Sequence, residues 1–407
     1  MPRKIGNSSY LLMAWLGASF VVVTGCNPQQ AENLGKIVVP HQEPPPPRPI
    51  EPPAPRDVWP PRAVWVVRRA YNSPEEIAGL MEACRQAGFN TVLFQVRGTA
   101  TVHYRSAIEP MAYEYRSPPT FDPLEVACRE AHRRGLALHA WVNMMPAWHG
   151  PTPPTDPRHV YNTHPEWFWY DQAGRRQPLG NCYVSLNPCL PEVRAYIVSI
   201  LEEIVRKYPV DGLHLDYVRF PTEGSPRKSE YPYDRNTLAL YRQATGQRPR
   251  DNRARWSSWR TQQVTQLVMD ARSMVTRVRP GVKLTAACGH DMNAWRKDYF
   301  QDGPTWVRNG YVDLIFVMNY TNNTAAFAQR QAAWRRAAGG YPVAAGIGLD
   351  QHRSPAISIE QIRMAQQWGQ GWSLFSSNLL FDGSPQSRYR LEQIRPALLA
   401  TMPRAPT

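Results

Sequence analysis

The chain has 407 residues, of which 43% are hydrophobic and 20% are charged. This composition provides a sizeable core and excludes a chain that is disordered throughout. Beyond the N-terminal segment no apolar stretch reaches about 18 residues, which excludes a protein with several membrane spans. Lys and Arg number 47 against 33 Asp and Glu, for a net charge of +14. Such a charge suits either a polyanionic partner or a basic, solvated surface.

The N-terminal segment has the features of an export signal. Arg3 and Lys4 precede an apolar stretch from Tyr10 to Val23, and residues 1–25 contain no acidic residue. A basic start followed by a short apolar region is typical of a secretory signal peptide. The sequence Thr24-Gly25-Cys26 resembles a bacterial lipobox, so we predict that residues 1–25 are removed and that Cys26 is lipidated. An uncleaved single-pass anchor is the alternative.

Residues 26–61 are predicted to be a tether. Residues 27–61 contain 12 prolines, including Pro44 to Pro47, and such a segment favours polyproline II over helix or strand. The segment is either a spacer that lifts the folded part off the membrane or a passive linker. We expect an exported protein anchored to a membrane by its lipid. Asn27 rather than Asp follows Cys26, which favours the periplasmic face of the outer membrane if the cell has one. Export argues against nucleic acid as a partner.

Strands and helices alternate between residues 62 and 400. Eight strands are predicted, at Ala63–Arg69, Thr91–Arg97, Leu136–Asn143, Gly212–Phe220, Lys283–Cys288, Val312–Asn319, Pro342–Leu349 and Gly371–Asn378. Helices are predicted near residues 74–87, 122–134, 191–207, 254–279, 294–301, 324–338, 359–369 and 386–400. Eight such units predict an α/β fold, a (β/α)₈ TIM barrel, over residues 62–400, with 401–407 as a tail. A doubly wound sheet is the alternative, but no GxGxxG follows the first strand.

Five cysteines lie beyond Cys26. Cys182 and Cys189 share a predicted loop and could form a disulfide in an oxidising compartment. Cys84 and Cys128 lie in helical patterns and are predicted to be buried. No CxxC or CxxxH spacing is present, so we expect neither a metal nor another cofactor.

Polar residues gather at the predicted C-terminal ends of the strands, where barrel enzymes have their active sites. Arg68 and Arg69 end the first strand, and Asn378 ends the eighth. The predicted substrate-binding residues are Gln95, Arg97, Tyr104, His139, Trp141, Asn143, His214, Arg219, Asn319 and Tyr320. The loop Met144–Leu190 adds several aromatic residues, among them Trp148, which can stack on sugar rings. The alternative is that these aromatics fix the loop to the barrel.

Several motifs resemble one bacterial family. These motifs are Thr91–Arg97 with Tyr104-Arg-Ser106 and Glu109-Pro110, Leu138–Asn143, Leu186-Asn187-Pro188, and Val210–Pro221 with its Asp211, His214, Asp216 and Arg219. They are similar to the bacterial glycosyl-hydrolase-like family 10. The family usually has Arg-Pro where this chain has Arg97-Gly98. The resemblance implies a TIM barrel, an exported and often lipid-anchored protein, and glycosidase action on the glycan strands of peptidoglycan.

Glycoside hydrolysis requires two carboxyl groups that flank the scissile bond. Asp216 is the first candidate, because it ends the fourth strand. His214 lies two residues earlier, where the similar strand of α-amylase-type barrels has Arg, and a cation there would lower the pKa of Asp216. The second carboxyl group is left open between Asp350, Glu109 and Asp291. Asp211 precedes the strand and is predicted to be structural.

Three functions remain open for this barrel, which we expect to be a monomer. The first is a glycoside hydrolase that cleaves peptidoglycan-type polysaccharide. The second is a lipoprotein that binds glycan without cleaving it. The third is a metal-dependent hydrolase or deacetylase, in which His139, His214, Asp216 and His290 would converge on a divalent ion.

Overall fold

The structure is a computed structural model, and it describes residue 56 and residues 58–115, 119–220 and 229–400. The predicted signal peptide, the lipidation at Cys26, most of the tether and the tail 401–407 lie outside the described residues and stay predictions.

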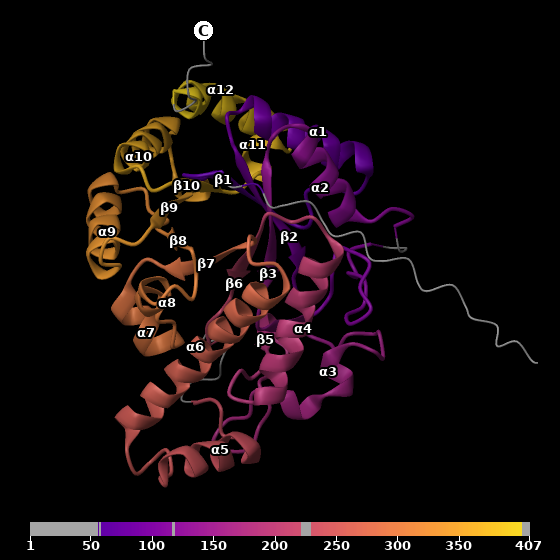
Figure 1. Cartoon of the computed structure of the whole chain (residues 1–407), viewed down its shortest axis with the longest axis vertical. Coiled ribbons are helices and arrows are strands. Elements are labelled where there is room, and N and C mark those ends of the chain that lie inside the picture. Colours follow the sequence, from indigo (N-terminus) through magenta and orange to yellow (C-terminus); the bar gives the residue numbers. More distant parts are fainter. Residues whose placement is uncertain (1–55, 57, 116–118, 221–228, 401–407) are drawn as a thin grey trace, which may run out of the picture. The chain divides into compact units, whose positions relative to one another are not determined.

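Eight parallel strands close into a barrel in the order β1-β10-β9-β8-β7-β6-β3-β2, as Figure 1 shows. The strands are β1 (Arg62–Val66), β2 (Thr91–Arg97), β3 (Ala137–Asn143), β6 (Gly212–Asp216), β7 (Lys283–Gly289), β8 (Leu314–Met318), β9 (Val343–Gly348) and β10 (Trp372–Phe375). Each observed strand overlaps one of the eight predicted strands. The predicted fold class, a (β/α)₈ barrel, is confirmed.

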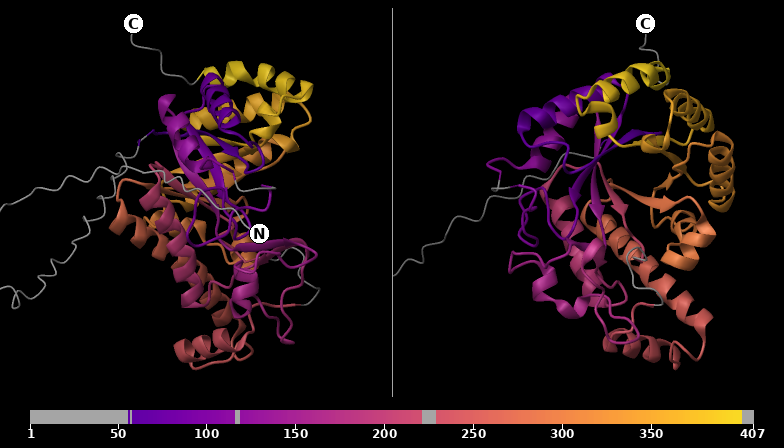
Figure 2. Two further views of the ribbon diagram at one scale, coloured as in Figure 1. Left: turned by 90° about the vertical axis from the view of Figure 1, so that its right-hand side faces the viewer. Right: turned by 180° about the vertical axis from the view of Figure 1, so that it is seen from behind.

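Helices surround the barrel on its outside (Figure 2). Those that were predicted are α1 (Pro74–Gln86), α2 (Pro123–Arg133), α4 (Pro191–Lys207), α6 (Arg253–Val278), α7 (Met292–Tyr299), α9 (Thr324–Ala337), α10 (Pro355–Trp368) and α12 (Pro385–Leu399). The sequence marks their starts, because Ser73 and Asp122 cap the backbone N–H groups of α1 and α2 and a proline follows each cap.

The loops contain elements that the sequence patterns did not reveal. The predicted loop Met144–Leu190 contains an antiparallel hairpin, β4 (Pro146–Gly150) with β5 (Gly180–Ser185), and between them α3 (Val160–Thr163) and the 3₁₀ helix η2 (Pro165–Trp167). Short elements elsewhere are α5 (Arg235–Thr245), α8 (Gly303–Arg308), η3 (Leu349–Gln351) and α11 (Asn378–Phe381). Apart from α5, these loop elements have only three to six residues, too few to give a period that sequence inspection can detect.

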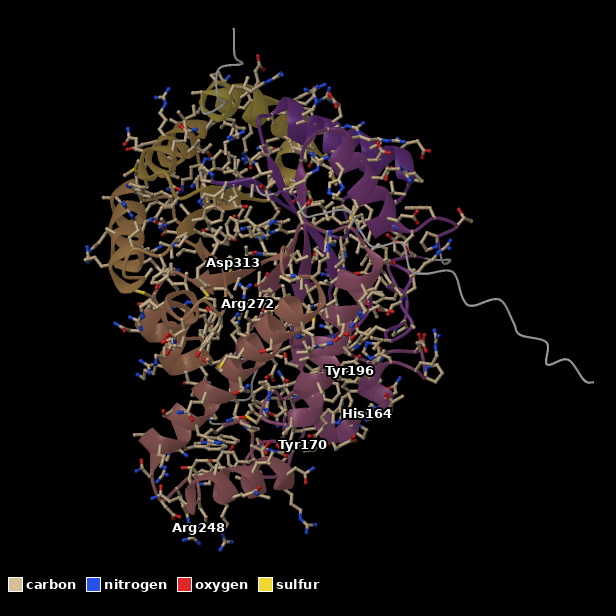
Figure 3. All side chains as sticks on the ribbon, viewed as in Figure 1. His164, Tyr170, Tyr196, Arg248, Arg272 and Asp313 are labelled. Atoms are coloured by element: carbon tan, nitrogen blue, oxygen red, sulfur yellow. The ribbon has the colours of Figure 1, made fainter. Side chains whose placement is uncertain are left out.

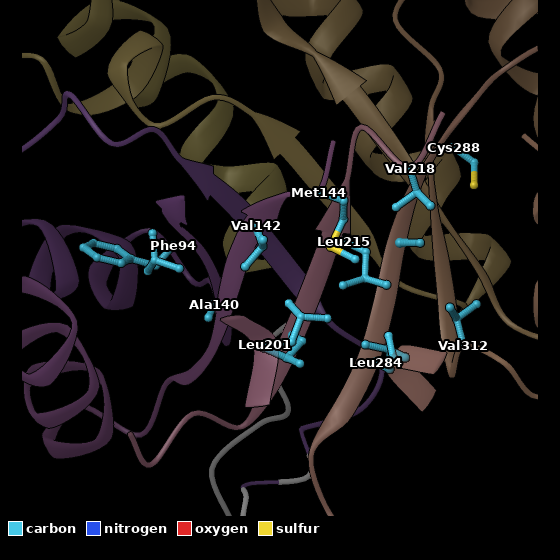
Figure 4. Packing of buried hydrophobic residues seen from close by; sticks show 14 of the residues in the cluster. Phe94, Ala140, Val142, Met144, Leu201, Leu215, Val218, Leu284, Cys288 and Val312 are labelled. Atoms are coloured by element: carbon cyan, nitrogen blue, oxygen red, sulfur yellow. The ribbon is translucent and has the colours of Figure 1, made fainter. Parts of the chain in front are cut away.

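Strand side chains alternate between two apolar clusters, as the period of two requires. Trp65, Leu93, Trp141 and Phe316 point into the barrel and pack together there. The neighbouring positions point outward against the helices, and Figure 4 shows part of this larger cluster, including Val142, which follows Trp141. The barrel interior is therefore filled by side chains, and a ligand can enter only at an end.

Polar residues just before three strands tie together the N-terminal end of the barrel. Asn90, Asp211 and Asp313 each accept a hydrogen bond from the backbone N–H group at the start of the neighbouring strand, at 2.7–2.8 Å. Asp313 also pairs with Arg272 of α6 at 2.8 Å (Figure 3). Buried backbone groups need such partners, so this end of the barrel is built for stability.

The described cysteines are all unpaired. Cys84 and Cys128 are fully buried, as predicted, and burial raises the pKa of both thiols. Cys182 lies on β5 and Cys189 is buried before α4, without a disulfide between them. No helix among the described residues combines the length and the hydrophobicity that crossing a membrane requires.

Candidate active site

A cavity of about 460 Å³ lies at the C-terminal ends of the barrel strands. Its lining combines aromatic rings, arginines, amides and one carboxyl group, namely Trp65, Val67, Arg68, Arg69, Gln95, Tyr113, Trp141, Asn143, His149, Tyr183, Asp216, Tyr217, Arg219, Ala287, Met318, Tyr320 and Phe375. Of the predicted site residues, it brings together Gln95, Trp141, Asn143, Asp216, Arg219 and Tyr320. Its size is within the range of pockets that bind small ligands.

Among the described residues that line this cavity, only Asp216 has an acidic side chain. It is the last residue of β6, and its side chain is held at both oxygens. The indole Nε1 of Trp141 donates to Oδ2 at 3.1 Å, and the backbone N–H of Tyr217 donates to Oδ1 at 2.7 Å. Only 8% of Asp216 is exposed. The carboxyl group is thus fixed in orientation and mostly shielded from water.

Burial raises the pKa of Asp216 above its usual value. The backbone N–H of Tyr217, the charge of Arg219 and the indole of Trp141 act in the opposite direction but do not overcome the desolvation. The expectation of a lowered pKa is therefore wrong. A carboxyl group that keeps its proton to a higher pH than a free aspartic acid suits the role of general acid.

His214, which was expected to supply the cation beside Asp216, is neutral. Its side chain is fully buried inside the barrel, and burial holds its pKa well below the usual value. Trp65 Nε1 donates to His214 Nε2 at 3.0 Å, so Nε2 carries no proton. The proton is on Nδ1, which donates to Thr285 Oγ1 at 2.9 Å. The imidazole is a support beneath the cavity, and it lies outside the lining that a substrate can reach.

Amides and an indole surround Asp216 on the neighbouring strands. Asn143 of β3 pairs in register with Asp216, and Gln95 Nε2 of β2 donates to Asn143 Oδ1 at 3.4 Å. Gln95 Oε1 in turn accepts from the backbone N–H of Arg68 at 3.1 Å. Adjacent strands therefore present a row of oriented hydrogen-bonding groups at one level of the barrel.

The predicted roles of Glu109 as a catalytic acid and Arg97 as a substrate-binding residue are contradicted by their burial. The two side chains form a bidentate ion pair at 2.7 and 2.8 Å, with 0% of the Arg97 side chain and 1% of the Glu109 side chain exposed. Tyr196 Oη also donates to Glu109 at 2.7 Å, and Arg97 donates to the carbonyl groups of Asn143 and Met144. This pair fixes the loops that follow β2 and β3, and neither residue lines the cavity.

The two other acidic candidates are exposed and lie outside the lining. Asp291 caps the N-terminus of α7, where it accepts from the backbone N–H groups of Asn293 and Ala294. Asp350 lies on η3, directly after β9. The pKa of Tyr320 is raised well above its usual value, first by burial and then by the charges of Asp216 and Asp350.

Four predicted substrate-binding residues have structural positions instead. Tyr104 and Asn319 are fully buried, and Asn319 Nδ2 donates to the carbonyl of Phe327 at 2.8 Å. His139 pairs with Gly212 at the start of β6, so its ring lies toward the other end of the barrel. Trp148 packs beside Tyr113, with ring centroids 5.3 Å apart, and thereby supports a residue that does line the cavity. A side chain can therefore point into the barrel and still lie too far along the barrel axis to reach the cavity.

The hairpin supplies the wall that sequence inspection missed. His149 of β4 and Tyr183 of β5 line the cavity with ring centroids 5.3 Å apart, and Tyr183 meets Tyr217 at 5.2 Å. The aromatic residues Phe168 and Trp169, by contrast, are fully buried and attach the loop to the barrel. No sequence signal separates these two groups, because the pairing of β4 with β5 decides which rings face the cavity.

Backbone conformations shape two positions of the rim. Tyr217 has a φ of +52°, which is uncommon outside glycine and turns the chain directly after Asp216. Gly98 leaves space for Arg68, because a Cβ atom there would lie 2.5 Å from the Arg68 guanidinium carbon.

A metal centre finds no support among the described residues. No three His, Cys, Asp or Glu side chains are grouped to hold an ion in the parts of the chain that the structure describes. His139, His214, Asp216 and His290, the residues of the metal alternative, are not brought together.

An aromatic cavity with a buried carboxyl group at the C-terminal end of a (β/α)₈ barrel is the kind of site in which such enzymes bind sugars. Residues 59–368 match the Glycosyl hydrolase-like 10 family, and the chain belongs to this family.

Among curated proteins, the chain is 26% identical over 278 residues to the glycosyl hydrolase DigH of Escherichia coli (strain K12), covering 61% of this chain and 58% of DigH. It is 26% identical over 302 residues to the glycosyl hydrolase YngK of Bacillus subtilis (strain 168), covering 67% of this chain and 55% of YngK. The chain thus spans just over half the length of these relatives.

Solved structures share the fold. The glycoside hydrolase domain of PgaB (BpsB) from Bordetella bronchiseptica superposes with a TM-score of 0.60 at 13% identity, covering 82% of this chain and 98% of that domain. The catalytic domain of β-amylase from Paenibacillus polymyxa superposes with a TM-score of 0.57 at 11% identity, covering 84% of this chain and 98% of that domain. At identities this low, the superpositions show only that this chain shares the barrel fold.

Proposed function

We propose that this protein is a glycoside hydrolase that cleaves peptidoglycan-type glycan strands, with Asp216 as its general acid. One observation carries the proposal: a buried carboxyl group with a raised pKa lies in an aromatic cavity at the catalytic end of the barrel. The membership in the Glycosyl hydrolase-like 10 family supports the reaction class.

The charge of the cavity favours an anionic saccharide. Three arginines, Arg68, Arg69 and Arg219, line the cavity. Among the described lining residues, they face a single acidic side chain, that of Asp216. Glu114 pairs with Arg68 at 2.9 Å and with Arg69 at 3.6 Å, while the Arg69 side chain stays 65% exposed at the rim. Once peptides are removed, the muramic acid units of a peptidoglycan strand each carry a free carboxylate. Such carboxylates match guanidinium groups in charge and geometry.

For the second carboxyl group of the reaction we propose Asp350. Asp350 follows β9 directly, at the same end of the barrel as Asp216, although it lies outside the lining of the cavity. Asp350 is exposed, so its carboxyl group can reach a substrate and would serve as the base or nucleophile while Asp216 donates a proton. Glu109 is excluded from this role by its buried ion pair with Arg97.

The N-terminal segment supports the further proposal that this activity is located in the cell envelope. Cleavage before Cys26 and lipidation of that residue would anchor the barrel to a membrane, and the proline-rich tether would give it reach along the glycan. Labelling with a fatty-acid analogue tests the anchor, because Cys26→Ala should abolish the label. Persistence of the label would contradict it.

The activity is tested by incubating the exported protein with peptide-free glycan strands and measuring new reducing ends. We expect release by the native protein and by Asp291→Asn, since Asn also caps helices well. Asp216→Asn should reduce release on the order of 10²–10⁴-fold. Equal release by Asp216→Asn and the native protein would overturn the mechanism.

A second function, glycan binding without cleavage, is favoured by the single carboxyl group in the described lining. Retention of glycan strands by the native protein without any new reducing ends would establish it. Release of acetate that a chelator abolishes would instead indicate a metal-dependent deacetylase.

A further inference from the structure

A second groove opens beside the candidate active site. It has a volume of about 490 Å³ and lies between α1 and the segment from Ser377 to Asp382, which includes α11. Arg69 lines both this groove and the cavity that contains Asp216. Figure 1 shows α1 and α11 in the same part of the barrel, although they come from opposite ends of the folded chain. The groove and the cavity are therefore neighbours, and the side chain of Arg69 lies between them.

The walls of the groove have the mixed character of a saccharide site. Asn72 and Asn378 offer amide donors and acceptors, and Glu76 and Asp382 offer carboxylate acceptors for hydroxyl groups. Leu80 and Phe381 add apolar surface on which the C–H face of a sugar ring can lie. All four polar residues are exposed and can reach a ligand.

An unsatisfied hydroxyl group lies in the same wall. Ser377 is 1% exposed, and its Oγ has no hydrogen-bond partner within the part of the chain that the structure describes. Buried polar groups in native proteins are nearly always paired, so this hydroxyl group beside the groove is a position for a bound water molecule or for a ligand hydroxyl group. A serine hydroxyl reorients by rotation about a single bond, which allows it to meet a sugar hydroxyl.

We propose that this groove is an additional saccharide-binding site that holds further sugar units of the strand whose scissile bond lies at Asp216. The proposal rests on the proposed function. A strand that occupies both spaces passes over Arg69, so the protein would bind long strands better than short fragments.

Gly79 provides a direct way to block the groove. It lies on α1 in the groove wall, is exposed, and an added Cβ atom there meets no other atom within 4 Å. Gly79→Trp should fill the groove, and Gly79→Ala is the matched control, because alanine leaves the groove open and favours the helix. Substrates are peptide-free glycan disaccharide, tetrasaccharide and octasaccharide, with reducing ends as the readout.

For the octasaccharide, we expect Gly79→Trp to lower kcat/KM about tenfold, as the loss of two neutral hydrogen bonds would do. For the disaccharide, Gly79→Trp, Gly79→Ala and the native protein should agree. Equal kcat/KM of all three proteins for the octasaccharide would overturn the groove proposal while leaving the proposed function intact.

Binding separates this proposal from the catalytic one. In an Asp216→Asn background, the affinity for octasaccharide should exceed that for disaccharide, and Gly79→Trp should remove the difference. If no oligosaccharide is cleaved by the native protein but this length dependence persists, the hydrolytic function fails and the groove stands. If affinity is independent of length, the groove proposal fails.

Discussion

Two aspartates, Asp211 and Asp216, flank the same strand and have opposite surroundings. Asp211 precedes β6 and accepts from the backbone N–H groups of Leu138 and Arg56 and from His132, at 2.6–2.8 Å. Asp216 ends β6 beside an open cavity, with two donors and a raised pKa. The strand has one end built for stability and one end where a carboxyl group is kept reactive.

The comparison shows why barrel ends differ in function. At the N-terminal end, Asn90, Asp211 and Asp313 all bond to the backbone of a neighbouring strand. At the C-terminal end, strand residues face an opening that loops surround, so their polar groups remain available to a ligand. The four predictions below test this division, from the largest expected effect to the smallest.

The largest effect is expected for Asp216→Asn. We expect kcat/KM to fall on the order of 10³-fold, because the proton donor is lost. The melting temperature should change little, since the cavity remains. Calorimetry beside the reducing-end assay checks both. If Asp216→Asn were fully active, or if it failed to fold, the proposed difference between a catalytic Asp216 and a structural Asp211 would be wrong.

Next in size is Glu109→Gln, which leaves the buried guanidinium of Arg97 without its counter-charge. We expect the free energy of unfolding to fall by about 3 kcal/mol. Activity per folded molecule should persist near native values, because the pair lies outside the cavity. Urea denaturation measures the stability, and an unchanged midpoint would show that this pair does not stabilise the loops.

Asp211→Asn should lower the free energy of unfolding by roughly 1–3 kcal/mol, because one of its acceptor oxygens is replaced by a donor. Activity measured well below the melting temperature should be retained. This outcome is the opposite of the one expected for Asp216→Asn, which should lose activity and keep its melting temperature. A large loss of activity with native stability would contradict the assignment of Asp211 to the structural end.

The smallest effect concerns pH. Because burial raises the folded-state pKa of Asp216, its protonated form is favoured in the folded protein. Its contribution to stability is fully present below the unfolded pKa, about 3.9, and is lost as pH rises through the raised pKa. The native protein should therefore lose stability relative to Asp216→Asn as pH rises above about 4. Melting curves of both proteins check this, and a constant difference would contradict the raised pKa.

Much of the catalytic end follows from sequence alone. Alternating strand and helix patterns gave all eight strands, and the position of Asp216 at the end of the fourth predicted strand put it in the cavity. Trp141 and Asn143 followed from the period of two. The same reasoning failed for His139, because the period gives the face of a strand and not the level within the barrel.

The sequence by itself determined the barrel and the end of it that carries Asp216, because strand periodicity and helix caps act over a few residues. Only the tertiary structure decided which charges meet. It paired Glu109 with Arg97 in the interior, it left His214 neutral between Trp65 and Thr285, and it brought the hairpin with Tyr183 over the cavity. Burial and the pairing of distant segments set these outcomes, and neither is encoded in local spacing.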